Sequence, residues 1–107
     1  MPEPVNLEID LAALPVVHNA AASRFEVILP EETALLTYRT APGEIAFLHT
    51  DVPPGFRGRG LAAKIVRAAL DFARAEHLKV LPYCPYVAAF MRRYPQYQDV
   101  LAPGFKG

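Results

Sequence analysis

Apolar and polar residues alternate in three consecutive segments of the first half of the chain, and this period of two predicts β-strands. The segments are residues 24–29, 33–40 and 44–52, and Ala41-Pro42-Gly43-Glu44 supplies a turn between the last two. Such short connections predict an antiparallel meander. Residues 15–18 predict a further strand ahead of it.

The third segment divides its side chains between two faces. Strict alternation places Ile45, Phe47, His49 and Asp51 on one face, and Ala46, Leu48, Thr50 and Val52 on the other. The pattern therefore predicts that the His49 side chain lies on the same face of the strand as Phe47 and on the other face from Val52.

One long segment has apolar residues at helical spacing. They recur every three or four positions within residues 60–77, and polar residues form the opposite stripe. Residues 79–82 then predict a short strand, and Pro85 suits the first turn of a second helix that runs to about Tyr94. The order of strands, helix, strand and helix predicts an α+β or α/β layer with helices packed on a mixed sheet. The length of 107 residues suits one domain, residues 1–107.

The composition excludes several classes of protein. Apolar residues make up 52% of the chain, yet no apolar run approaches the roughly 20 residues of a membrane span. The acidic N-terminus lacks the basic-then-apolar plan of a secretory signal. Cys84 is the only cysteine, which excludes an intramolecular disulfide, and three scattered histidines do not predict a metal site. We therefore expect a cytoplasmic protein.

The formal net charge is zero, but the charges are unevenly distributed. Residues 1–56 hold two arginines and eight acidic residues, whereas residues 57–79 hold six basic residues and two acidic ones. A nucleic-acid-binding domain is disfavoured, because affinity for a phosphate backbone needs many cations on one face of a basic protein. The local excess of cations suits a small ligand with several phosphates better.

The glycine-rich turn before the long helix has an unusual charge pattern. No Ser, Thr, Asp or Asn is available as an N-cap, and Arg57 and Arg59 have the wrong sign for the positive end of the helix dipole. The pattern makes sense if the negative charge comes from a ligand, since glycines admit a close approach and free N–H groups point at it. The alternative is a plain glycine turn with solvated arginines.

Three separated motifs of the chain carry a resemblance to a known family. The run Val52-x-Pro54-x-x-Arg57-Gly58-x-Gly60-Leu61-Ala62 resembles the acetyl-CoA signature of the GNAT superfamily, including the strand before it and the helix after it. Together with His49-Thr50-Asp51-Val52-Pro53-Pro54 and Cys84-Pro85-Tyr86-Val87-Ala88-Ala89-Phe90, it resembles the small GNAT-like proteins, the N-acetyltransferase-domain-containing group. The similarity spans roughly residues 20–97.

The resemblance implies both a fold and a ligand. The fold would be a minimal α+β GNAT domain, with a mixed, mostly antiparallel sheet, a central helix after the glycine loop and a second, C-terminal helix. The ligand would be acetyl-CoA, the acyl donor. The resemblance assigns the pantetheine arm to the backbone of Val52, where two strands splay apart. It assigns the pyrophosphate to the backbone N–H groups of Gly58, Arg59, Gly60, Leu61 and Ala62. The side chains of Arg57 and Arg59 would assist in binding the phosphates.

Two residues are candidates for chemistry. Cys84 precedes a helix whose N-terminus would favour its thiolate, so it is a nucleophile or proton donor, or else a small buried residue. His49 is a general base for an amine acceptor, or else a structural histidine. Four tyrosines near the C-terminus are candidates to line an acceptor groove, but packing in the core is favoured for them: Tyr83, Tyr86, Tyr94 and Tyr97. Met91 stands where many GNAT enzymes have the tyrosine that protonates the leaving thiolate, and it cannot donate a proton.

Two functions follow from these residues. The first is transfer of the acetyl group to an unidentified amine acceptor, by direct attack or through Cys84. The second is a CoA-binding or acyl-CoA-binding module without turnover, which the identity of Met91 favours.

Overall fold

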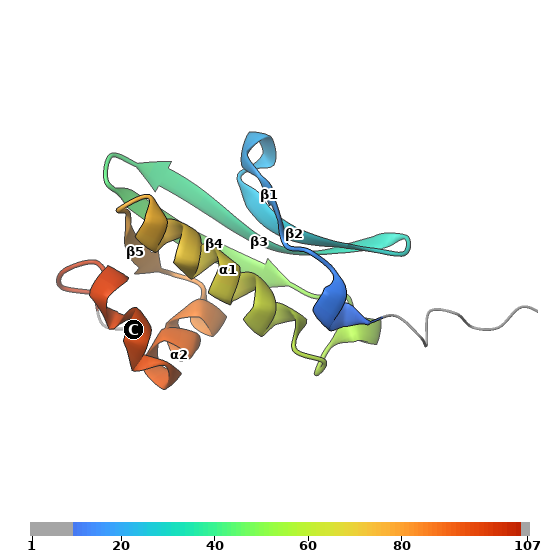
Figure 1. Ribbon diagram of the computed structural model, residues 1–107. Helices are drawn as coiled ribbons and strands as arrows, with labels where there is room; N and C mark the ends of the chain where they lie inside the picture. Colours follow the sequence, from blue (N-terminus) through green and yellow to red (C-terminus); the bar gives the residue numbers. More distant parts are fainter. Residues whose placement is uncertain (1–9, 106–107) are drawn as a thin grey trace, which may run out of the picture.

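The computed structural model describes residues 10–105 and confirms the expected strands and helices (Figure 1). The boundaries of the predicted elements agree within about two residues, the usual uncertainty at element ends. The strands are β1 (Val17–Asn19), β2 (Arg24–Leu29), β3 (Glu32–Ala41), β4 (Glu44–Asp51) and β5 (Lys79–Pro82), and the α-helices are α1 (Leu61–Ala75) and α2 (Pro85–Arg93).

The strands form one sheet in the order β1-β2-β3-β4-β5. β1 to β4 pair antiparallel as a meander, and β5 pairs parallel to β4. A parallel neighbour requires a crossover connection, which α1 supplies. The expected mixed, mostly antiparallel α+β fold is therefore confirmed.

A β-bulge in β4 changes the predicted faces of that strand. The pairs on either side of the bulge are, in order along β3, Leu36 with Thr50, Thr37 with His49 and Tyr38 with Phe47. Leu48 is the extra residue, so the alternation shifts by one position at this point. Thr50 consequently joins Phe47 on one face, while His49 lies on the other. The prediction that His49 shares the face of Phe47 was wrong, because a period of two does not allow for an inserted residue.

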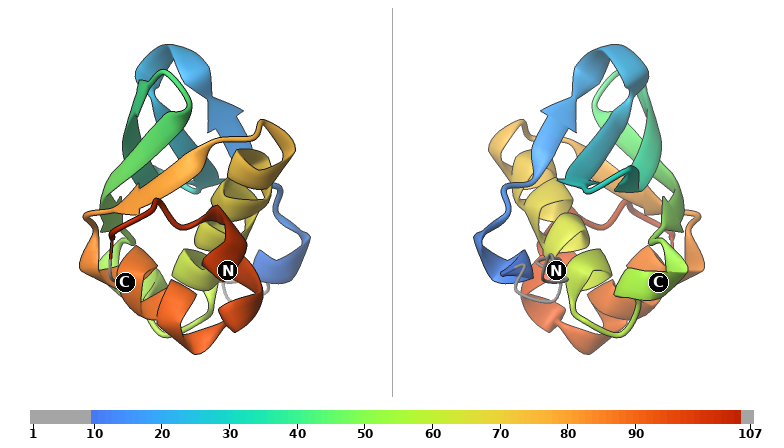
Figure 2. Two further views of the ribbon diagram at one scale, coloured as in Figure 1. Left: turned by 90° about the vertical axis from the view of Figure 1, so that its left-hand side faces the viewer. Right: turned by 90° about the vertical axis from the view of Figure 1, so that its right-hand side faces the viewer.

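The two helices bury one face of the sheet. α1 crosses the strands and α2 packs beside α1 and β5, as Figures 1 and 2 show. The side chains at the centre of this layer are completely buried, among them Phe47, Leu36, Ile65 and Leu70. We call this the inner face of the sheet. On the opposite, outer face Arg39, His49 and Asp51 are exposed.

None of the helices within residues 10–105 combines the length and the hydropathy that a membrane span requires.

Candidate functional site

β4 and β5 separate halfway along β4. Their pairing covers only Glu44–Phe47 of β4, and one further backbone bond follows, in which the N–H of Cys84 donates to the carbonyl of Phe47 at 2.9 Å. Beyond this point the chain after β5 turns into α2, whereas β4 continues to Asp51. The last residues of β4 therefore pair with β3 alone and present a free backbone edge. The splay expected from the resemblance is present.

The glycine loop follows the free end of β4 and leads into α1. A 3₁₀ turn at Pro54–Phe56 comes first, and then Gly58 and Gly60 adopt φ of +74° and +85°. These values are left-handed and favour glycine. A β-carbon at either position would meet nothing within 4 Å, so the loop faces open space.

The start of α1 leaves its backbone donors free. Gly60 is the N-cap, no side chain caps the helix, and no acidic residue lies in its first turn. The first N–H in this region with an acceptor is that of Lys64, which donates to the carbonyl of Gly60 at 3.1 Å. The N–H groups from Gly58 through Ala63 have no acceptor within residues 10–105. Such an array at the positive end of a helix dipole is suited to an anion.

A cavity of about 290 Å³ lies against these donors. It brings together the loop and the end of β4, as the resemblance implied, and it adds Tyr86 from the first turn of α2. Its lining consists of Val52, Phe56, Arg57, Gly58, Gly60, Leu61, Ala62 and Tyr86. We call it the loop cavity.

The sequence favoured packing for Tyr86, but its side chain lines the candidate site. Its side chain is 39% exposed and lines both the loop cavity and a neighbouring cavity of about 270 Å³ that also contains Arg93 and Tyr94. Burial, and after it the nearby Tyr94, raises the pKa of Tyr86. Its hydroxyl therefore remains a hydrogen-bond donor at neutral pH. The sequence did contain a signal that Tyr86 lies at the site, since it stands two residues after Cys84 in the first turn of the predicted helix.

The two arginines of the loop are placed differently. The Nε of Arg57 donates to the carbonyl of Val52 at 2.8 Å, which ties the loop to the end of β4. The guanidinium of Arg59 lies 5.9 Å from the ring centre of Phe56. Arg57 thus has a structural contact in addition to the role that the resemblance assigns it.

Cys84 lies on the inner side of the splay. It is the N-cap of α2, its side chain is only 2% exposed, and its Sγ lies 3.7 Å from the hydroxyl of Thr50. It does not line the loop cavity. His49 is exposed on the outer face of β4. The structure therefore brings Cys84 to Thr50 and separates it from His49 by the thickness of the sheet.

No group of three or more potential metal-binding side chains (His, Cys, Asp or Glu) occurs within the described part of the chain.

Two parallel strands that splay apart, joined through the uncapped, glycine-rich start of the central helix, are the arrangement that the resemblance to GNAT acyltransferases implied. Residues 24–100 match the sequence model of the GCN5-related N-acetyl-transferase family, and the chain belongs to this family.

Several individual proteins are similar over most of their length. Protein NATD1 of Mus musculus is 37% identical over 93 residues, covering 82% of this chain and 84% of that protein. Protein NATD1 of Danio rerio is 34% identical over 91 residues, covering 80% and 83%. A Staphylococcus aureus protein described as a GCN5-like N-acetyltransferase candidate, solved in solution by NMR, superimposes with a TM-score of 0.68 at 27% identity. That match covers 83% of this chain and 88% of the other.

Proposed function

We propose that this protein binds acetyl-CoA at the glycine loop and transfers the acetyl group to an amine. The observation that carries the proposal is the unbroken row of free N–H groups from Gly58 through Ala63, because four of these six residues (Gly58, Gly60, Leu61 and Ala62) line the loop cavity. Two phosphates of one pyrophosphate can accept from several of these donors at once. The glycine conformations also hold the donors in place before the ligand arrives, which lowers the entropic cost of binding.

The pantetheine arm would run from the loop toward the splay. Val52 lines the loop cavity at the end of β4, and the free backbone edge of that strand continues from it. Backbone groups on this edge can hydrogen-bond the amides of pantetheine as a neighbouring strand would. This course places the thioester near Thr50 and Cys84, because both lie where β4 leaves β5.

The acceptor would approach from the outer face. α1 and α2 close the inner face with fully buried side chains such as Val87 and Met91, whereas the outer face of β4 is open. His49 is exposed there and is the candidate base that takes a proton from the attacking amine. In direct transfer, the amine nitrogen bonds to the acetyl carbon, the C–S bond breaks, and the CoA thiolate takes up a proton.

A route through Cys84 has support from its surroundings. Cys84 is the N-cap of α2, and its Sγ lies 3.7 Å from the Thr50 hydroxyl, so the two groups can share a hydrogen bond. The thiolate would attack the thioester carbonyl and release CoA, and the amine would then attack the S-acetyl group and regenerate the thiol. Because the Cys84 side chain is 2% exposed, this route requires the acyl group to enter between β4 and α2.

Intact-protein mass spectrometry after incubation with acetyl-CoA, without an acceptor, tests the Cys84 route. We expect one added acetyl group in the wild type and none in Cys84→Ala, with CoA affinity nearly unchanged. Thr50→Val is the matched control: it should still acquire the acetyl group, more slowly. Full turnover by Cys84→Ala with an amine panel would establish direct transfer. If the wild type neither acetylates itself nor consumes acetyl-CoA with any amine, the CoA-binding module without turnover replaces this proposal.

A further inference from the structure

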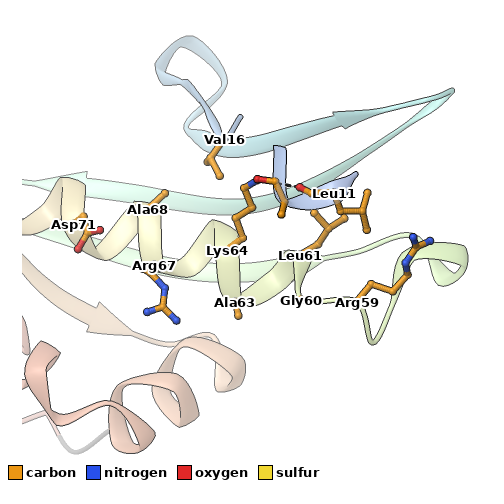
Figure 3. Close-up of a pocket in the computed structure, with 11 residues that line it drawn as sticks. Leu11, Val16, Arg59, Gly60, Leu61, Ala63, Lys64, Arg67, Ala68 and Asp71 are labelled. Carbon is orange, nitrogen blue, oxygen red and sulfur yellow. Dashed lines mark hydrogen bonds between the residues drawn. The ribbon is translucent and has the colours of Figure 1, made fainter. Parts of the chain in front are cut away.

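A groove of about 670 Å³ runs along the exposed side of α1, beside the segment that precedes β1. Its residues come from the end of the glycine loop, from the first three turns of α1 and from that segment (Figure 3). It begins at Gly60 and Leu61, the two residues that it shares with the loop cavity, and it extends as far as Asp71. The groove therefore continues outward from the proposed pyrophosphate site.

Three cations line this groove: Arg59, Lys64 and Arg67. None of them forms an ion pair within residues 10–105. The one acidic residue of the lining, Asp71, lies at the far end and accepts a hydrogen bond from the hydroxyl of Tyr97 at 3.3 Å. The end of the groove nearest the loop is consequently positive without a compensating anion.

Lys64 forms one side of the groove. Its Nζ donates to the carbonyls of Leu11 at 2.9 Å and Ala12 at 2.7 Å, and Figure 3 shows the side chain reaching up to that segment. An ammonium has three donors, so one remains for a ligand.

Arg67 forms the other side and points away from Lys64 (Figure 3). Its guanidinium lies 5.3 Å from the ring centre of Phe90 and 5.4 Å from that of Tyr94. A guanidinium over aromatic rings is held in position while its N–H groups, which lie in its plane, can bind a phosphate.

The spacing along α1 connects Arg67 to the loop. One face of the helix start carries, at helical spacing, Gly60, Ala63 and Arg67. The first two of these residues lack bulky side chains. From Ala62 to Arg67 the helix rises about 7.5 Å. CoA carries its third phosphate on C3′ of the same ribose whose C5′ bears the pyrophosphate. A pyrophosphate at the loop therefore brings this phosphate within reach of side chains in the first two turns of α1.

We propose that Arg67 binds the 3′-phosphate of CoA, with Lys64 adding positive charge from the other side of the groove, and so makes the protein select CoA over dephospho-CoA. The inference rests on the proposed function, since it takes the pyrophosphate to lie at the loop. It assigns to the groove a specificity role that the loop itself cannot have, because both ligands carry the same pyrophosphate.

Isothermal titration calorimetry with CoA and with dephospho-CoA tests the inference. The wild type should bind CoA at least about tenfold more tightly than dephospho-CoA, because one charge-assisted hydrogen bond contributes at least that ratio of affinities. In Arg67→Gln this ratio should fall close to one through weaker CoA binding, with the dephospho-CoA affinity unchanged. Lys64→Gln should lower the ratio less.

Two arginines of α2 serve as matched controls. Arg92→Gln removes the same charge from an exposed position that lines neither the groove nor the two smaller cavities, and it should leave the ratio unchanged. Arg93→Gln tests the neighbouring cavity on the other side of Arg67. An unchanged ratio in Arg67→Gln, or a ratio that collapses only in Arg93→Gln, overturns the inference and leaves the loop site intact. If the wild type binds neither ligand, the proposed function itself fails.

Discussion

The two ends of α1 satisfy their backbone groups in different ways. At the C-terminal end, the N–H of Leu78 donates to the carbonyl of Ala73 at 2.8 Å and that of His77 to Arg74 at 3.2 Å. With His77 at a left-handed φ of 57°, this is the Schellman arrangement. At the N-terminal end, Gly60 is also left-handed, but the N–H groups that follow it have no acceptor in the described chain.

The charged side chains suit the helix dipole at the C-terminal end of α1 and oppose it at the N-terminal end. Arg74 lies in the last turn, where a cation interacts favourably with the helix dipole, and its guanidinium is hydrogen-bonded to the carboxylate of Asp99. That hydrogen bond is the main cause that lowers the pKa of Asp99. Arg57 and Arg59 lie next to the positive end, where a cation is unfavourable. One end of the helix therefore has its backbone groups satisfied within the protein, whereas the other presents free donors to the anionic ligand that we propose.

Closing the open end with a carboxylate should have the largest effect. Gly60→Asp places a negative side chain in the open space before the free N–H groups, so we expect CoA binding to be abolished in calorimetry. Gly60→Ala is the control: the β-carbon at φ +85° costs about 1–2 kcal/mol of stability, but it brings no charge and should retain binding. Normal CoA affinity in a folded Gly60→Asp protein would contradict the loop assignment.

Removing the positive charges of Arg57 and Arg59 should have an intermediate effect on CoA affinity. The double variant Arg57→Gln with Arg59→Gln should weaken CoA by about 1.5–3 kcal/mol per charged hydrogen bond lost, and by more at low salt. Dephospho-CoA should bind to the wild type and lose the same amount in the double variant, since both ligands carry the pyrophosphate. Arg39→Gln, on the exposed outer face, provides the comparison for loss of charge alone. Normal affinity in the double variant would make both loop arginines plain surface residues.

A substitution at the C-terminal end of α1 should change the stability of the protein and leave CoA affinity unchanged. His77→Gly relieves a left-handed residue that carries a β-carbon, so it should stabilise the protein by about 1 kcal/mol. Thermal unfolding should then shift upward by about 4–8 °C. His77→Ala retains the β-carbon and should give no such gain. A change of CoA affinity in His77→Gly would show that the two ends are not independent.

Most of the fold could be predicted from the order of its periodic segments. The strands around residues 24–52 alternate clearly, and the 3.6-residue period of α1 is long enough to leave no doubt about its type. The loop arginines also indicated an anion site, because charge at a helix end is a local property. The bulge at Leu48 could not be predicted, since an inserted residue in an antiparallel pair depends on the partner strand. As a result, the faces of Thr50 and His49 were resolved only by the register with β3.

The elements, the glycine loop and the missing helix cap follow from local sequence, because they depend on neighbours within a few residues. Which distant side chains meet is a property of the packed fold. It placed Thr50 against Cys84, Tyr86 across the cavity from the loop, and Arg67 over the rings of Phe90 and Tyr94. Each of these contacts joins elements brought together by the parallel pairing of β5 with β4 and by the packing of α2 against α1. Where that pairing stops and how those helices pack follow from burial of the whole core, which no local pattern specifies.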